Sequence, residues 1–321
     1  MSESLTHTPV LLSEVLEVLD PQPGETLVDC TAGLGGHAAA VAARVGPSGQ
    51  VVLLDLDPGN LARAEAAVRA ALTPAEPWRA RVIAIQANFA SVGRELVGRG
   101  LRADMLLADL GFASTQMDDA ARGFSFRRAG PLDMRLDPAG PIRAAELVNT
   151  LPERELADLI YRFGEDRLSR RIARAIVEAR AHSPIETTDR LAEVVARAYP
   201  VQARHGPIHP ATRTFQALRI AVNDELGNLE ALLAAIAREA GRAGAPGQGW
   251  LNSGSRVALI SFHSLEDRPI KIALREIADR GFGQILTRRP ISASEDEVSR
   301  NTRARSAKLR SLKLTKSLPD S

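Results

Sequence analysis

The chain has 321 residues and is 45% hydrophobic, which is enough for a substantial core in one large or two ordinary domains. Its formal net charge of +2 does not by itself imply a nucleic-acid partner. The only cysteine, Cys30, excludes an intrachain disulfide, and we expect it to be a small buried strand residue rather than a nucleophile. Without a long apolar run or leader-like segment, we expect a cytoplasmic protein that does not contact a membrane.

A glycine-rich turn at residues 31–38 is the most informative local pattern. The apolar run at residues 26–30 predicts a buried strand before it, and the alanine-rich stretch 38–44 predicts a helix after it. Glycines allow a sharp turn and a close approach of ligand to backbone, and the helix N-terminus offers unpaired N–H groups. This segment therefore predicts a nucleotide pocket.

Two cofactors fit this pocket equally well from the residues alone. Gly33, Gly35 and Ala38 satisfy the dinucleotide pattern, and Asp55 follows a second strand at residues 50–54. An acidic residue there can hold the ribose hydroxyls of NAD or of S-adenosylmethionine. A tight strand-to-helix turn without a ligand is the structural alternative.

Strands and helices then alternate. We expect a helix at residues 13–19, with Ser13 as its cap, and a second helix at 58–72. We expect one strand at 81–86, which is followed by Asn88 and Phe89, and another at 104–108, which is followed by Asp109. Asn88 and Phe89 could flank an adenine. This alternation predicts an α/β fold with a doubly wound, mainly parallel sheet, whose ligands lie at the carboxyl ends of the strands. Asp29, Asp55, Asn88 and Asp109 fall at such ends, although each could instead be a helix cap.

Residues 114–210 contain no good strand and predict an inserted all-helical domain, with helices at 153–161, 166–180 and 189–199. The rest, residues 1–113 and 211–321, would form the sheet domain. The second helix is rich in arginine, for which a solvated face is the default explanation. Those arginines are Arg167, Arg170, Arg171, Arg174 and Arg180.

The pattern returns to the sheet after the insert. A long helical region at 211–240 and a loop at 241–255 precede a fifth strand at 256–261 and a helix at 268–280. Two last strands are expected at 283–287 and 307–314. Residues 300–316 hold seven Lys or Arg and no acid, which either guard an edge strand or follow a phosphate backbone.

The ordered motifs along nearly the whole chain resemble those of a known family. The sequence is similar to the bacterial small-subunit (16S) ribosomal RNA cytosine-N4 methyltransferases, the RsmH/MraW family. The matching segments are residues 7–12, 35–37, 55–58, 109–111, 122–126, 130–135, 171–176, 209–219, 261–268 and 303–306. The chain departs from the family pattern at Phe112-Ala113, so we assign no catalytic hydroxyl at position 113, and in its longer 241–255 loop.

The resemblance implies a Rossmann-like class I methyltransferase sheet with the helical domain as substrate-recognition insert. It implies methyl transfer from S-adenosylmethionine to the exocyclic amino nitrogen of a decoding-site cytidine, with small-subunit ribosomal RNA as partner, in an assembled or nearly assembled 30S subunit. With Gly33 from the glycine pattern, the cofactor contacts it implies are Gly35, Gly36, His37, Asp55, Phe89, Asp109 and Gln116.

The transfer chemistry selects candidates at the strand ends. An activated methyl group needs positioning more than a strong base, and acceptors for the amino N–H groups favour the reactive form of the nitrogen. Asp109 is the first such acceptor, or it serves mainly the cofactor. Ser261, Phe262 and His263 follow, with Phe262 or His263 stacking on an extruded base; for His263 an ordinary structural role is the alternative.

Arginines of the insert and the C-terminal region are candidate RNA contacts. We expect Arg135, Arg171, Arg174, Arg213, Arg303 and Arg305 to bind RNA. No metal is expected, because prolines prevent a regular helix from presenting His205 and His209 together. Two other functions stay open from the residues: a non-catalytic RNA-binding or assembly factor that binds the same cofactor, and an NAD-dependent oxidoreductase.

Overall fold

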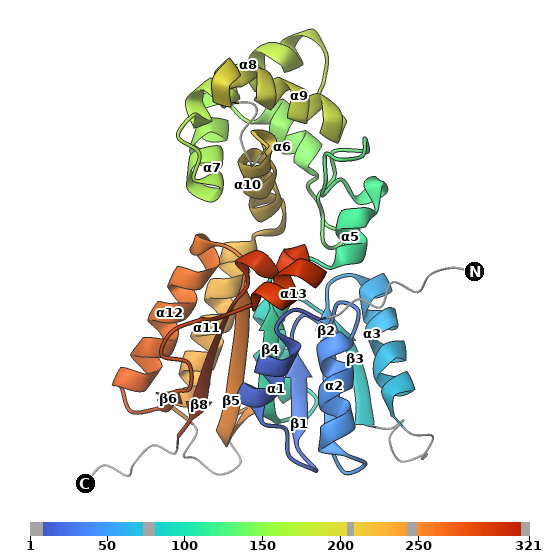
Figure 1. Ribbon diagram of the computed structural model, residues 1–321, viewed down its shortest axis with the longest axis vertical. Helices are drawn as coiled ribbons and strands as arrows, with labels where there is room; N and C mark the ends of the chain where they lie inside the picture. Colours follow the sequence, from blue (N-terminus) through green and yellow to red (C-terminus); the bar gives the residue numbers. More distant parts are fainter. Residues whose placement is uncertain (1–8, 73–80, 204–208, 243–248, 316–321) are drawn as a thin grey trace. The chain divides into compact units, whose positions relative to one another are not determined.

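The chain divides into two units, each built around its own apolar side chains (Figure 1). The structure is a computed structural model, which describes residues 9–72, 81–203, 209–242 and 249–315. Unit 1 comprises Met1–Gly111 and Leu226–Ser321, and unit 2 comprises Phe112–Glu225. The first boundary lies close to the expected one. The second lies at residue 225 instead of 210, because the helix that follows Pro210 packs inside unit 2.

Unit 1 contains an eight-stranded sheet in the order β3-β2-β1-β4-β5-β8-β6, with β7 also paired to β8. The first five strands are parallel, and β8 runs antiparallel to β5, β6 and β7. The chain order reverses between β1 and β4, which is where sheets of this class form a ligand crevice. The strands are β1 Thr26–Asp29, β2 Gln50–Asp55, β3 Val82–Gln86, β4 Ala103–Asp109, β5 Leu251–Ser261, β6 Gly283–Ile285, β7 Ile291–Ser292 and β8 Lys308–Leu314.

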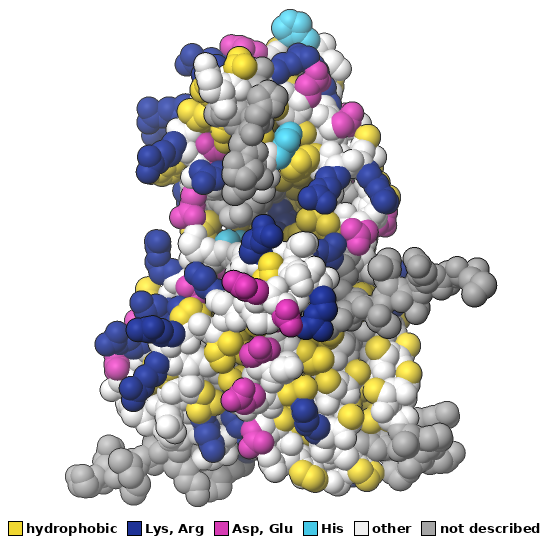
Figure 2. Space-filling model, viewed as in Figure 1, with side chains coloured by type: hydrophobic (Ala, Val, Ile, Leu, Met, Phe, Trp, Pro, Cys, Tyr) yellow, Lys and Arg dark blue, Asp and Glu magenta, His cyan; other side chains and the backbone are white. Residues whose placement is uncertain are grey.

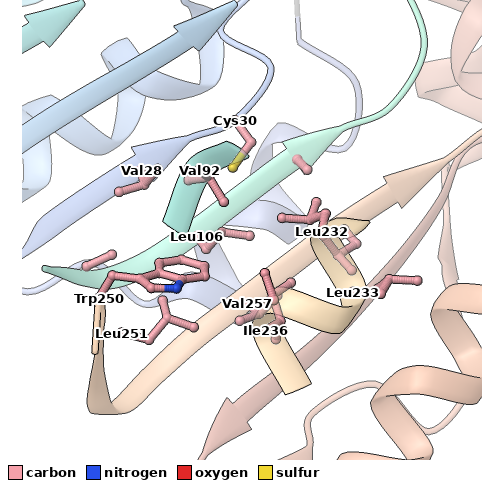
Figure 3. Close-up of a cluster of buried hydrophobic side chains, with 14 of the residues drawn as sticks. Val28, Cys30, Val92, Leu106, Leu232, Leu233, Ile236, Trp250, Leu251 and Val257 are labelled. Atoms are coloured by element: carbon pink, nitrogen blue, oxygen red, sulfur yellow. The ribbon is translucent and has the colours of Figure 1, made fainter. Parts of the chain in front are cut away.

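Alternate side chains of these strands enter two cores, one on each face of the sheet. Leu27 and Leu107 pack with α1, α2 and α3 on one face, while Val28 and Leu106 pack with α4, α11 and α12 on the other. Figure 3 shows the second core, where Cys30 lies among apolar side chains, as expected. The helices are α1 Leu12–Leu19, α2 Gly36–Val45, α3 Pro58–Ala71, α4 Val92–Val97, α11 Glu225–Ala240, α12 Ser264–Asp279 and α13 Glu295–Arg300.

The N-terminal segment is held by contacts far away in the sequence. Leu11, with a left-handed φ of 53°, precedes α1 and donates its N–H to Glu297 Oε1 in α13 at 2.7 Å. Val10 offers its carbonyl oxygen to His37 Nε2 at 2.8 Å. The helix therefore begins at Leu12 without the expected Ser13 cap, because the carboxylate of α13 takes over a hydrogen bond at this end.

Unit 2 is helical, and within its described residues the one β pairing is an isolated bridge between Pro131 and Thr187. This agrees with the prediction that residues 114–210 hold no strand. Its helices share a single core, to which Ile160, Ile176 and Leu218 contribute. They are α5 Ser114–Asp118, α6 Ala144–Thr150, α7 Glu153–Gly164, α8 Ser169–His182, α9 Thr188–Ala198 and α10 Ala211–Asn223.

The helical region predicted at 211–240 is confirmed and consists of two helices, α10 and α11. Asp224 takes a left-handed φ of 46° between α10 and α11. Asn223 accepts the Leu136 N–H at 2.7 Å and donates to the Met134 carbonyl at 2.8 Å, which fixes the end of α10 within unit 2. The strand β5 also begins earlier than expected, at Leu251, and β7 and α13 had no predicted counterpart.

Along the described ranges, no helix is both long enough and apolar enough to cross a bilayer.

Candidate cofactor and active site

The glycine turn joins the end of β1 to α2, as the sequence predicts. Gly33 and Gly35 take left-handed φ values of 53° and 80°, which side chains other than glycine rarely adopt. Ala32 donates its N–H to the Leu54 carbonyl at 2.8 Å, so the turn is fixed to the end of β2. The turn thereby lies at the carboxyl edge of the sheet, beside the point where the strand order reverses.

The three glycines of the turn differ in how much space a Cβ atom would have at their positions. A Cβ on Gly35 would lie 2.7 Å from the Cα and carbonyl oxygen of Ala64, and one on Gly36 would lie 2.3 Å from Pro9 Cγ. Packing therefore requires glycine at both positions. A Cβ on Gly33 would meet only the Thr31 carbonyl oxygen at 3.7 Å. Gly33 is thus the position of the turn with room for a ligand next to the backbone.

Asp55 connects β2 to this turn. Its Oδ2 accepts the Gly33 N–H at 2.8 Å and its Oδ1 accepts the Asp57 N–H at 2.8 Å. Burial raises the pKa of Asp55, while both backbone hydrogen bonds oppose that rise. The N-cap of α3 is Asp57 rather than Asp55. The alternative role of Asp55 as a helix cap is therefore wrong.

Two further carboxyl groups meet where β1 and β4 end. The Asp109 N–H donates to Thr31 Oγ1 at 2.6 Å, and the Thr31 N–H donates to Asp29 Oδ1 at 3.1 Å. The pKa of Asp29 is raised to about 7, mainly by burial. The charge of Asp55 also raises this pKa, whereas the hydrogen bonds from Thr31 lower it. Burial, and then the charges of Asp29 and Glu266, raise the pKa of Asp109 to about 8.

Asp109 also has an unused acceptor atom. Its Oδ1 has no hydrogen-bond partner within the described residues. Asp109 does not cap a helix either, since α5 begins after Ala113. A buried carboxyl oxygen without a partner is costly in its charged form unless a ligand supplies a donor or a positive charge. Asp109 is therefore the strongest candidate of the site for contact with a bound group.

The turn after β5 adds aromatic and acidic side chains to the same edge. The Phe262 ring lies beside Gly111, where an added Cβ would be 3.8 Å from Phe262 Cδ2. Glu266, only 3% exposed, accepts the Phe262 N–H through Oε2 at 2.8 Å. Its Oε1 lies 3.3 Å from His263 Nε2. Glu266 thus fixes the Phe262 backbone by a hydrogen bond and lies close to the His263 ring, whose two nitrogens have no hydrogen-bond partner within the described residues.

Glu266 was not among the predicted site residues, although the local sequence contains a signal for it. It lies in the first turn of α12, four residues after Phe262 and three after His263, and side chains at that spacing can reach back to the residues before a helix. Asp29 was noted at a strand end without a role. Its burial, at 2% exposed, and its link through Thr31 to Asp109 place it in the acidic group.

Other predicted site residues have identifiable structural contacts. Asn88 caps the short helix Phe89–Ser91 by accepting the Ala90 N–H at 2.9 Å, so the capping alternative holds for Asn88. Phe89 packs against the core on the α11 side of the sheet. Ser261 is fully buried and its hydroxyl donates to the Lys308 carbonyl at 3.5 Å, across the β5–β8 pair. Gln116 belongs to unit 2, where its Oε1 accepts the Ala113 N–H at 2.9 Å.

The predicted RNA-contacting arginines fall into distinct environments. Arg135 is committed to its own unit, because it donates twice to Asp133, at 2.8 and 2.7 Å, and once to the Gly140 carbonyl at 2.8 Å. Arg171 and Arg174 are exposed on α8, and Arg213 is exposed on α10 with a bond to the Glu165 carbonyl at 3.1 Å. Arg305 is exposed and Arg303 partly buried before β8. The expectation for His205 falls outside the described residues.

The charge at the carboxyl edge of the sheet distinguishes between NAD and S-adenosylmethionine, the two cofactors that the sequence left open. Asp29, Asp55, Asp109 and Glu266 are all acidic, and across the described residues no Lys or Arg is among the groups that shift the first three pKa values. A ligand with sulfonium and ammonium groups would stabilise these carboxyl groups in their charged form and lower their raised pKa values, whereas a diphosphate such as that of NAD would raise those values further. The unpartnered Asp109 Oδ1 and the open backbone at Gly33 fit a cationic nucleoside.

The sheet order and this acidic strand edge are those expected of a Rossmann-like methyltransferase that uses S-adenosylmethionine. Residues 4–315 match the model of the MraW methylase family, and the chain belongs to that family. The predicted fold class and cofactor are thereby confirmed, and the oxidoreductase alternative is wrong.

Related proteins are similar over almost their whole length. The "Ribosomal RNA small subunit methyltransferase H" of Acidobacterium capsulatum is 48% identical over 95% of this chain and 97% of its own. The protein of the same name from Koribacter versatilis is 44% identical over 96% of this chain and 94% of its own. A SAM-dependent O-methyltransferase structure from Thermotoga maritima has a TM-score of 0.41 and 11% identity, covering 99% of this chain and 70% of that one.

Proposed function

We propose that the protein methylates the exocyclic amino nitrogen of a decoding-site cytidine in 16S ribosomal RNA, within assembled or nearly assembled small subunits in the cytoplasm. The relatives named as ribosomal RNA small-subunit methyltransferases support ribosomal RNA as the substrate. The acceptor atom Asp109 Oδ1, without a partner among the described residues, carries the proposal for an amino group. A cytosine amino group presents N–H donors, which a carboxylate can accept.

The chain's own residues supply position and proton acceptance. Bound S-adenosylmethionine provides an activated methyl group and a positive charge. Gly33, Asp55 and Asp109 would hold it at the strand ends. A cation at this edge lowers the pKa of Asp109, so that its carboxylate can accept the amino N–H and favour the reactive, pyramidal nitrogen. The Phe262 ring would stack on an extruded cytosine, with the turn fixed by Glu266.

The test is transfer of labelled methyl groups to undermethylated small subunits and, in parallel, to naked 16S RNA. After digestion, we expect label in amino-methylated cytidine from the subunits. Label from naked RNA alone would support the chemistry and contradict the assembled substrate. Cofactor binding without any label would contradict the proposed function and favour a non-catalytic assembly factor.

Asp109→Ala in the same assay tests the acceptor. We expect a loss of at least about 100-fold in transfer rate, a magnitude typical of removing one preorganised polar group from an active site. The circular dichroism spectrum should stay that of the unaltered protein. Retention of most of the activity would remove Asp109 from the proposed catalytic set.

A further inference from the structure

A groove runs between α8 and α9 of unit 2 and has a volume of about 710 Å³. Four arginines line it: Arg171 and Arg174 from α8, and Arg190 and Arg197 from α9. Small or short apolar side chains, among them Ala175 and Val194, also line it. The groove thus joins a cationic rim with an apolar lining that leaves room for a ligand. In Figure 2, Lys and Arg side chains are frequent on the visible face of this unit.

The acids near the groove do not neutralise it. Among the residues that line it, Glu178 is the single acid against four arginines. Glu193 pairs with Arg190 at 2.9 Å and also with Arg197, and Glu153 lies 3.7 Å from Arg174. The arginine side chains in these pairs are 41%, 66% and 71% exposed, and pairs so open to water are weak. Within the described residues Arg171 forms no ion pair.

The spacing of the arginines matches an extended anionic ligand. Arg171 and Arg174 are one helical turn apart, and Arg190 and Arg197 are two turns apart, so each pair forms a row along its helix. Guanidinium groups bind phosphate oxygens through paired N–H donors, and weak surface partners exchange readily for phosphates. A single small anion would use only one end of such a double row.

We propose that the α8–α9 groove binds the sugar-phosphate backbone of the RNA substrate; this rests on the proposed function. Contacts to the backbone position the RNA and carry no base specificity. The groove adds Arg190 and Arg197 to the predicted RNA contacts Arg171 and Arg174. It leaves Arg180 out, because Arg180 donates to the carbonyls of Val148 and Leu151 at 2.6 and 2.7 Å.

The test compares two full-length variants with the same change in charge. The groove variant is R171Q/R174Q/R190Q/R197Q. The matched control is R154Q/R162Q/R167Q/R170Q, whose arginines are exposed on the same unit and do not line the groove. Filter binding of naked 16S RNA and of small subunits is measured between 50 and 300 mM salt, with S-adenosylmethionine binding and thermal unfolding as checks. The double variants R171Q/R174Q and R190Q/R197Q replace the groove variant if it does not fold.

For the groove variant we expect a rise in Kd of at least about tenfold for RNA and subunits, and a slope of log K against log salt that is smaller by about 2 to 4. The control should keep a slope close to that of the unaltered protein. Equal losses in both variants would overturn the groove as a site. Loss for subunits with unchanged binding of naked RNA would overturn RNA as its occupant and favour an acidic ribosomal protein. Failure of the unaltered protein to methylate would contradict the proposed function alone, since binding decides the groove.

Discussion

Asp109 makes the stability of unit 1 depend on pH. Its pKa is about 8 in the folded protein and near 3.9 in an unfolded chain, so between these values the folded state binds the extra proton. The free energy of unfolding therefore falls as pH rises from about 4 to about 8. Asp29, with a pKa of about 7, acts in the same direction. This part of the site lowers the stability of the cofactor-free protein at neutral pH.

Asp109→Asn should remove that penalty while keeping the shape of the side chain. We expect the variant to gain about 1 to 3 kcal/mol more in free energy of unfolding at pH 8.5 than at pH 5, since one pKa unit corresponds to about 1.4 kcal/mol. Urea unfolding without cofactor at both pH values measures the difference. Asp158→Asn, on the exposed face of α7, is the control and should show no such dependence. An equal effect of Asp109→Asn at both pH values would contradict the protonated state.

Glu266 gives a second prediction at the residue scale. Glu266→Gln keeps an oxygen for the Phe262 N–H and removes a negative charge that raises the pKa of Asp109. We expect the lower midpoint of the pH profile of kcat/KM for methyl transfer to move to lower pH, by up to about one unit. Glu266→Ala, which leaves the Phe262 N–H without its acceptor, should also destabilise the fold by about 1 to 3 kcal/mol. An unmoved midpoint in Glu266→Gln would reduce Glu266 to a purely structural residue.

At the scale of elements, close approach of α7 and α10 explains why α10 belongs to the helical unit. Gly164 ends α7, and a Cβ there would lie 2.6 Å from the Arg213 carbonyl oxygen in α10. Ala211, Phe215 and Leu218 of α10 are buried in the core of unit 2. The absence of a side chain at one position thus allows two helices to share a core.

Gly164→Ala tests this packing. The added methyl group must displace backbone, which should cost about 1 to 3 kcal/mol even though alanine is the better helix former. Gly241→Ala is the control, because its Cβ would meet neighbours only at ordinary contact distances of 3.6 Å or more. Chemical unfolding of the two variants gives the comparison. Equal stabilities would show that α7 and α10 adjust without cost.

Local patterns were sufficient for the strands other than β7 and the start of β5, for the glycine turn and for the burial of Cys30, because periodicity and glycine positions are encoded within a few residues. The end of α10 was not predictable in this way, since Asn223 binds Met134 and Leu136, 89 and 87 residues away. Likewise, the α8–α9 groove depends on two helices meeting, and the sequence suggested only the arginines of α8. Asp55 and Asp109 were found at strand ends, but the link from Asp109 through Thr31 to Asp29 needed the structure.

At the scale of the whole molecule, the small net charge of +2 results from acidic and basic regions that lie on different parts of the chain. The cofactor edge of unit 1 is acidic, and the groove of unit 2 is basic. Exposed cations also lie on α12, where Figure 2 shows Lys and Arg along one edge of unit 1; they include Arg268, Lys271 and Arg275. In the proposed function, opposite charges on separate units would keep the cationic cofactor and the anionic RNA from competing for one surface.

Separate cores predict that the cofactor protects the two units unequally. With S-adenosylmethionine at about 100 times its Kd, a ligand that binds only the folded state adds about 2.7 kcal/mol, or 100-fold in protection from unfolding. We expect amide hydrogen exchange in β1, β2 and β4 to slow by up to that factor, and exchange in α8 and α9 to change much less. Mass spectrometry of exchanged peptides measures both. Equal slowing throughout would show that the units unfold as one.

The bond between Leu11 and Glu297 has a consequence for synthesis of the chain. The segment that contacts Gly36 and His37 is made long before its partner α13 and before β8, the strand that lies between β5 and β6. While translation proceeds, the glycine turn can form with β1 and β2, but the segment beside it has no carboxylate to hold it. The segment beside the glycine turn is therefore fixed only after α13 has left the ribosome, and a chain that stops before Glu297 lacks this hydrogen bond.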